Sequence, residues 1–162
     1  MKTALIVVDI QNDYFARGNI ALENSEHALA AALDAIAQAK QAGDLVVGIQ
    51  HMSPSDGPFM ARGTEGAELH PAIAEALEDF VVIEKHQADS FLGTALGETL
   101  AAQDISAIRL VGMMTQNCIT HTALSPEAAG FDVTIIGAAC AAPTALINDI
   151  ALSGLAGRCK VV

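Results

Sequence analysis

The sequence has no tryptophan, and aromatic residues make up only 4% of its 162 positions. Its hydrophobic content is nevertheless 52%. The interior must therefore be built from alanine, valine, isoleucine and leucine, a mixture typical of helices packed on a parallel sheet that is buried on both faces. A chain of this length can bury a sizeable core, and we predict a single domain over residues 1–162.

The chain is also poor in positive charge. It has 8 Lys and Arg against 19 Asp and Glu, for a formal net charge of −11. Nucleic acids and anionic membrane surfaces favour basic patches, so we expect neither as a partner. No apolar run approaches the roughly 18 residues that a bilayer requires, and the N-terminal stretch lacks a small-residue cleavage site. We expect a cytoplasmic protein whose partner is a small-molecule substrate.

Common cysteine and nucleotide motifs are missing as well. The three cysteines, Cys118, Cys140 and Cys159, form neither a C-x-x-C pair nor a zinc-binding spacing. An odd number of thiols fits a reducing compartment. No G-x-G-x-x-G follows the first apolar run and there is no P-loop, so a nucleotide-binding module has no motif support.

What the sequence does contain is an alternation of short apolar runs and helical patterns. Continuous apolar runs rich in β-branched residues predict strands at 3–8, 45–50, 80–84, 105–111, 132–136 and 159–162. Apolar spacing and capping residues predict helices at 26–42, 71–77, about 90–100, 119–129 and 144–156. Pro126 should kink the fourth helix or end its regular hydrogen bonding. The alternation predicts an α/β fold: a three-layer α/β/α, Rossmann-like parallel sheet of about six strands with helices on both faces.

One connection is much longer than the others. Residues 52–70 are rich in Gly, Pro and Ser and show no period. A loop of nearly twenty residues inside a compact domain is more often functional than idle. We expect it to select the substrate, alone or together with a neighbouring subunit.

Three reactive residues follow the carboxyl ends of predicted strands. Asp9 follows the first strand, Lys85 the third, and Cys118 the fourth after a turn led by Gly112. Ligands of open parallel sheets bind at this edge, so the three side chains should share one crevice. N–H groups at the start of the next helix should stabilise a Cys118 thiolate. The carboxylate can take the thiol proton, and the ammonium can hold both anions.

Each of these residues also has a plainer interpretation. A free cysteine is often a buried core residue, and an aspartate after a strand often only begins a loop. Lys85 alone would fit a solvated strand end. A non-catalytic ligand-binding module on the same fold, with Cys118 inert, is therefore an alternative of a different class.

Three motifs occur in one order along the chain: VVDIQNDYF with Asp9, VIEKHQADSF with Lys85 and VGMMTQNCITHTA with Cys118. With them the chain resembles the isochorismatase-like cysteine hydrolase superfamily, which includes nicotinamidase, N-carbamoylsarcosine amidohydrolase and isochorismatase. The resemblance implies a catalytic triad of Asp9, Lys85 and Cys118. It also implies a cis peptide between Met113 and Met114, and an oxyanion hole made by the backbone N–H groups of Met114 and Cys118.

The reaction implied by the resemblance is hydrolysis of a C–N bond, amide or carbamoyl, through a thioester. Isochorismatase-type hydrolysis of a vinyl ether is the alternative within enzymes, although that reaction does not require the cysteine. Family members are commonly oligomeric, so we expect a homodimer or homotetramer. The candidate residues of the pocket wall are Gln11, Asp13, Phe15, His51 and Phe91, of which the two phenylalanines could equally belong to the core.

One branch of the family binds a metal through an Asp-x-His pair and a further histidine. Here the matching segment reads GIQHMSPSDG, with Ile49 two residues before His51. Asp56 and His70 are spare candidates, but the pattern is not met. We therefore predict that the site has no catalytic metal and no other cofactor.

Overall fold

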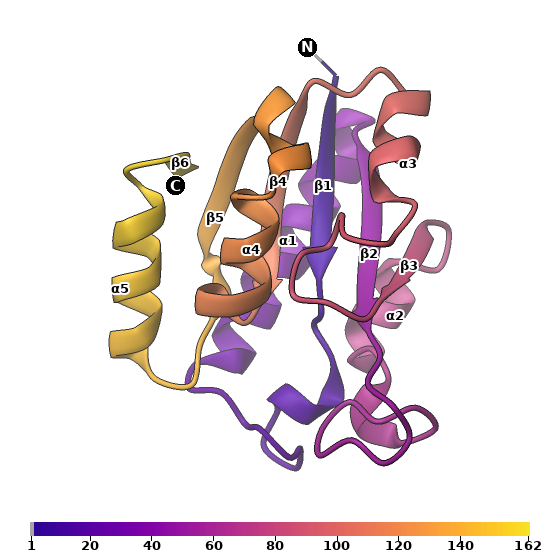
Figure 1. The fold of residues 1–162 in the computed structure, drawn as a ribbon, viewed down its shortest axis with the longest axis vertical. Helices are drawn as coiled ribbons and strands as arrows, with labels where there is room; N and C mark the ends of the chain where they lie inside the picture. The colour runs from indigo at the N-terminus through magenta and orange to yellow at the C-terminus, as the bar shows by residue number, and fades with distance from the viewer. Residues whose placement is uncertain (1) are drawn as a thin grey trace.

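The protein, described by a computed structural model over residues 2–162, is built on one sheet of six parallel strands. The strands are β1 (Thr3–Val8), β2 (Leu45–His51), β3 (Val81–Lys85), β4 (Ala107–Met113), β5 (Asp132–Ala141) and β6 (Lys160–Val161). Their order across the sheet is β3-β2-β1-β4-β5-β6 (Figure 1). The order reverses between β1 and β4, and such a reversal opens a crevice at the carboxyl ends of those two strands.

Helices cover both faces of the sheet, as the sequence predicts. One face carries α1 (Ser25–Ala42) and α2 (Pro71–Ala76); the other carries α3 (Leu96–Ala102), α4 (Thr120–Ala123) and α5 (Ala145–Leu155) (Figure 1). Successive residues of a strand point to opposite faces. Leu5 and Val7 of β1 accordingly enter the core under α1, while Ile6 enters the core under α3 and α4. No helix within residues 2–162 is long and apolar enough to span a membrane.

The prediction of a single helix over 119–129 is wrong. A π-helical turn, η3 (Thr115–Ile119), comes first, and α4 then ends at Ala123. Pro126 begins a separate 3-10 turn, η4 (Pro126–Gly130), whose Glu127 N–H donates to the Ser125 hydroxyl. Proline has no N–H for the helical hydrogen bond, so the helix ends before it.

The fifth strand runs five residues beyond its predicted end, from Asp132 to Ala141 instead of to Ile136. Its pairing with β4 shifts register between Leu110 and Gly112. The shift marks a bulge in β5, and β5 also contacts the turn that carries Cys118. The helix predicted over about 90–100 begins later, at Leu96, and ends at Ala102. The remaining strands and helices lie within two residues of their predicted bounds.

The long loop after β2 is tied firmly to the sheet edge. It contains a short 3-10 turn, η2 (Glu65–Ala67), which the sequence pattern does not reveal. The Ala67 carbonyl accepts hydrogen bonds from the side-chain amides of Gln11 and Gln50. The Asn12 side chain, in the 3-10 turn η1 (Asn12–Tyr14), donates to the Glu65 carbonyl. The loop is therefore a fixed wall of the molecule at the edge where β1 and β2 end.

Gly112 allows β1 and β4 to approach closely next to the crevice. Its φ is +129°, and a Cβ at this position would lie 1.9 Å from the Val8 carbonyl oxygen. Any side chain would therefore collide with the backbone of β1, beside Asp9. The glycine is a geometric requirement of the site.

We expect Gly112→Ala to lower the free energy of unfolding by roughly 2–4 kcal/mol, because backbone atoms cannot move aside as a flexible side chain can. The matched control is Gly154→Ala in α5, where a Cβ meets nothing within 4 Å. That change should be neutral or stabilising by up to about 1 kcal/mol, since alanine favours a helix. Urea denaturation of the two variants measures the difference, and equal stability would contradict the close approach.

Candidate active site

The structure brings the three predicted reactive side chains together at the sheet edge. The Lys85 Nζ lies 2.7 Å from the Asp9 Oδ2 and 3.4 Å from the Cys118 Sγ. Asp9 and Lys85 are 0% exposed and Cys118 is 3% exposed. Cys118 does lie in the core, as its interpretation as an ordinary buried cysteine requires. The contact with a buried ammonium is what distinguishes it from an ordinary core thiol.

Backbone geometry places each of the three residues. Asp9 directly follows β1 with φ of +51°, in the left-handed region that aspartate tolerates better than most residues. Lys85 ends β3, two strands away from β1, and spans β2 with its long side chain. Cys118 lies in the π-helical turn after β4. The peptide bond between Met113 and Met114 is cis, as the resemblance implies.

The Lys85 ammonium lies at the centre of the cluster and contacts four other residues. Besides Asp9 and Cys118, it contacts the Gln87 carbonyl oxygen at 2.8 Å and the His51 Nδ1 at 3.3 Å. Burial disfavours the ammonium, but the Asp9 carboxylate and then the Cys118 sulfur outweigh it and raise the pKa of Lys85. Lys85 is therefore charged at neutral pH. A buried charge is tolerable only when it is paired in this way.

Cys118 is a thiol in the resting protein. Burial, followed by the Asp9 charge, raises its pKa to about 12, although Lys85 acts in the opposite direction. The expectation that helix N–H groups stabilise a preformed thiolate is thus wrong. The helix after Cys118 has only four residues, so its dipole is small, and loss of solvation dominates.

Four of the five residues predicted to line a pocket instead bind backbone groups or pack in the core. The Gln11 side-chain amide donates to the carbonyls of His51 and Ala67 and accepts from the His51 N–H. The Asp13 carboxylate accepts from the backbone N–H groups of Asn19 and Met60. Both residues therefore brace the loop instead of facing a ligand, a difference that follows from their burial and from hydrogen bonds with distant backbone.

The two predicted phenylalanines are packed in the cores, the alternative that the sequence leaves open. Phe15 packs against His70 in a tilted arrangement with ring centroids 4.6 Å apart. Phe91 stacks on Phe131 with ring centroids 6.2 Å apart. Only His51 among the five lines an open cleft. That cleft has a volume of about 360 Å³ and is lined by His51, Met52, Ser53, Pro54, Arg62, His86 and Gln87.

This cleft adjoins the buried cluster through two of its lining residues. His51 and Gln87 both contact the Lys85 ammonium. Its size falls within the range of small-molecule sites. Sequence reasoning missed Arg62, His86 and Gln87, although the last two directly follow Lys85 in the motif VIEKHQADSF.

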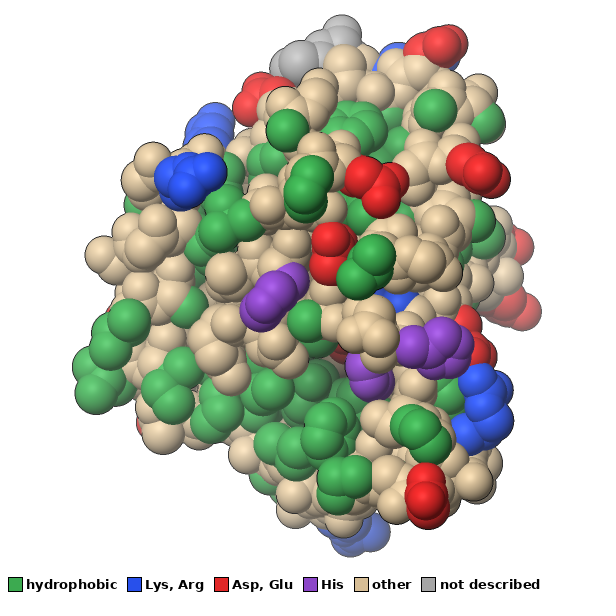
Figure 2. All heavy atoms as spheres, in the orientation of Figure 1, with side chains coloured by type: hydrophobic (Ala, Val, Ile, Leu, Met, Phe, Trp, Pro, Cys, Tyr) green, Lys and Arg blue, Asp and Glu red, His purple; other side chains and the backbone are tan. Residues whose placement is uncertain are grey.

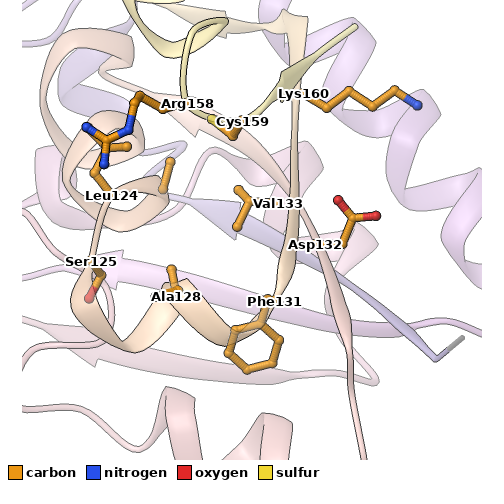
Figure 3. A pocket seen from close by; sticks show the side chains of 11 residues that line it. Leu124, Ser125, Ala128, Phe131, Asp132, Val133, Arg158, Cys159 and Lys160 are labelled. Atoms are coloured by element: carbon orange, nitrogen blue, oxygen red, sulfur yellow. The ribbon is translucent and has the colours of Figure 1, made fainter.

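Another hollow lies away from the reactive residues. It has a volume of about 290 Å³ and is formed by η4 and the chain end, with Ser125, Phe131 and Arg158 among its walls (Figure 3). None of Asp9, Lys85 and Cys118 lines it. The buried cluster of Asp9, Lys85 and Cys118 therefore adjoins the cleft beside His51 and not this hollow.

The side chains present do not fit a metal ion of the kind that one branch of the resembling family binds. Ile49 offers no ligand, and the His51 Nδ1 is occupied by the Lys85 ammonium. The His70 Nδ1 accepts from the Ala72 N–H as a helix cap. Within residues 2–162, no three His, Cys, Asp or Glu side chains are grouped to hold a metal.

Comparisons with known proteins give a consistent result. A family model described as the isochorismatase domain matches residues 3–162. An uncharacterized isochorismatase family protein of Bacillus subtilis is 36% identical over 150 residues, covering 92% of this chain and 83% of the relative. A protein of Arabidopsis thaliana named as a probable inactive nicotinamidase is 28% identical, covering 91% of this chain and 84% of its own. The crystal structure of a nicotinamidase from Bacillus subtilis aligns with a TM-score of 0.89 and 28% identity over 100% of this chain and 99% of that one.

The charges around Cys118 predict opposite effects of two substitutions on its pKa. Asp9→Asn removes an anion that disfavours the thiolate, so the pKa of Cys118 should fall. Lys85→Met removes the cation that favours the thiolate, so the pKa should rise further. The alkylation rate of Cys118 as a function of pH, followed by peptide mass mapping, measures both, with about tenfold in rate for each unit of pKa.

Cys140 is the internal control for this measurement. Burial raises its pKa to about 12 as well, and no charged side chain contributes. Neither substitution should change its alkylation profile. If Cys140 and Cys118 respond alike, the substitutions have loosened the fold and the electrostatic coupling is not supported.

Proposed function

The chain belongs to the isochorismatase family, and on that premise we propose that it is a cysteine hydrolase that cleaves a C–N bond of a small amide or carbamoyl compound. Hydrolytic activity is the common property of the family's enzymes. The observation that carries the finer proposal is the buried Lys85 ammonium between the Asp9 carboxylate and the Cys118 thiol. A vinyl ether hydrolase would not need that thiol.

In the proposed first step, Asp9 takes the Cys118 proton as the sulfur attacks the carbonyl carbon. The C–S bond forms and the carbonyl π electrons move to the oxygen. A free thiolate is unfavourable here because burial raises the pKa of Cys118 to about 12, so proton transfer and attack should occur together. Lys85 contacts both Asp9 and Cys118, and the negative charge therefore remains paired as it moves from one to the other.

The backbone N–H groups of Met114 and Cys118 are the proposed donors to the oxyanion. When the intermediate collapses, the C–N bond breaks and the departing amine takes the proton from Asp9. Asp9 then deprotonates a water molecule that attacks the thioester, and the acid and the Cys118 thiol are released.

A non-catalytic binding module is the second candidate, and one observation favours it. Cys118 is almost fully buried and protonated, as an inert core thiol would be. The Arabidopsis relative named as probably inactive belongs to the same family. Amide hydrolysis by the wild type that is lost in the cysteine variant separates the two candidates, because a binding module has no such activity to lose.

We expect the protein to release ammonia from at least one primary amide or carbamoyl compound in a panel that includes nicotinamide and N-carbamoylsarcosine. Cys118→Ala should lower kcat by more than about 10³-fold, because it removes the nucleophile. Cys140→Ala is the matched control and should retain activity. Hydrolysis of isochorismate that survives in Cys118→Ala would instead support the vinyl ether alternative.

We also propose that the protein forms a homodimer or homotetramer through the outer face of α5. Leu146 is 69% exposed, Ile150 is 63% exposed, and Leu124 beside them is 44% exposed. Figure 2 shows hydrophobic side chains on this edge of the molecule, where α5 lies in Figure 1. An apolar groove of about 480 Å³ separates α5 from α4. Apolar patches of this kind commonly mark protein interfaces.

We expect Ile150→Lys to shift the protein toward the monomer, since a charge on this face would have to be desolvated in the interface. Leu92→Lys, at a site 56% exposed before α3, is the control and should leave the oligomer intact. Sedimentation equilibrium of wild type and both variants gives the masses. A monomeric wild type would exclude this interface.

A further inference from the structure

The segment that carries Cys118 is too short to fix its own geometry. The π-helical turn η3 has five residues, and α4, which continues it, has four. Isolated helices shorter than about 12 residues are marginal in water. Contacts from the rest of the fold must therefore hold this segment in place. One of the elements that contact η3 is α5, which follows β5 in the chain.

A side-chain hydrogen bond joins α5 to the start of this turn. The Thr115 hydroxyl donates to the Asn148 Oδ1 at 2.5 Å. Thr115 is 0% exposed, and a buried hydroxyl is costly to leave without a partner. The hydrogen bond is therefore a strong restraint on how α5 and the turn lie against each other.

Thr115 is well placed to transmit this restraint to the reactive cluster. It lies between Met114 and Cys118, the two residues whose N–H groups are the proposed oxyanion donors. Its β-branched side chain has few rotamers, so holding the hydroxyl also holds the Thr115 backbone. The Thr115 carbonyl in turn accepts from the Thr120 hydroxyl at 2.7 Å. The residue is thus held from α5 through its side chain and from α4 through its backbone.

The helix α5 presents a polar side chain at this contact. Asn148 is half-buried against the turn, whereas its neighbours Ile147 and Asp149 are exposed. Apolar packing has no preferred direction, but a hydrogen bond requires its donor and acceptor to be aligned. The pair of Thr115 and Asn148 therefore specifies the orientation of the turn, beyond attaching the helix to the sheet.

We propose that Asn148 is a positioning residue, which through its hydrogen bond with Thr115 holds Cys118 against the Lys85 ammonium in the geometry that attack requires. This inference rests on the proposed hydrolysis and extends its site to α5, a helix that contributes no group to the buried cluster. A displacement of about 1 Å in an active site can lower the rate about 100-fold. A turn that has lost one restraint should lose less.

Two pairs of variants test the hydrogen bond from both ends. Thr115→Val removes the donor and Thr115→Ser keeps it, while Asn148→Ala removes the acceptor and Asn148→Asp keeps it. With the amide that the protein hydrolyses fastest, Thr115→Val and Asn148→Ala should each lower kcat about tenfold and change KM less than about twofold. The two conservative variants should recover most of the loss. Asp149→Ala, at the next and exposed position of α5, is the matched control and should leave kcat unchanged.

Alkylation of Cys118 reports on the turn without turnover. Burial and then the Asp9 charge keep Cys118 protonated, and both effects outweigh Lys85, so a loosened turn should lower its pKa. In Thr115→Val and Asn148→Ala, Cys118 should therefore react at least about threefold faster at neutral pH, as a fall of half a unit implies. Its alkylation thus rises while kcat falls. Cys140 is the internal control and should react as in the wild type.

The outcomes separate the inference from the proposed function. If an amide is hydrolysed and Thr115→Val retains the wild-type kcat, the positioning role is overturned. A faster alkylation that Cys140 shares also overturns it, because α5 has then come away from the sheet. If no amide is hydrolysed, the proposed function fails and alkylation decides the inference. A rise confined to Cys118 and reversed in Thr115→Ser would support Asn148 as the residue that holds the turn, and an unchanged rate would reject it.

Discussion

The buried ion pair between Asp9 and Lys85 is the constraint on which the rest of this site depends. Removing two charges from water costs several kcal/mol for each ion, and only close pairing offsets that cost. Asp9 and Lys85 come from strands that are not neighbours, so β1, β2 and β3 must keep their register for the charges to meet. Cys118, at the end of a fourth strand, then lies against a cation that is already fixed. The fold thus fixes the charges of Asp9 and Lys85 beside Cys118 without any ligand.

The order of the strands also decides what else can approach the pair. The strand β2 lies between β1 and β3, and the Lys85 side chain crosses the end of β2 to meet Asp9. The last residue of β2 must therefore lie beside the Lys85 side chain. That residue is His51, and the contact between them follows from the topology. On the other side, the reversal of strand order between β1 and β4 leaves room for the turn that carries Cys118. Each of the three side chains is therefore positioned by the end of a strand or by the turn that follows it.

The sequence predicts the strands, most helices and the grouping of Asp9, Lys85 and Cys118, because continuous apolar runs and strand ends are local features of the chain. It does not predict the bracing roles of Gln11 and Asp13, because their partners in the loop, Ala67 and Met60, are distant in the sequence and lie in a segment without periodicity. The protonation state of Cys118 was likewise out of reach, since burial, which outweighs every nearby charge, exists only in the folded protein. Pro126 predicts that regular helical hydrogen bonding is disrupted, but the local pattern reveals neither the π-helical turn over Thr115–Ile119 nor the end of α4 at Ala123.

Gln11 joins the edge of the buried cluster to the long loop after β2. One side-chain amide holds the backbone of His51, at the edge of the reactive cluster, and also the Ala67 carbonyl in the loop that walls the cleft. The loop is anchored at the end of β2, at Met60 and at Ala67. Between these points its sequence can therefore change without moving His51 or Lys85. Three side chains fixed by strand ends, next to a loop anchored at few points, are a physical arrangement in which the loop can vary while the cluster keeps its geometry.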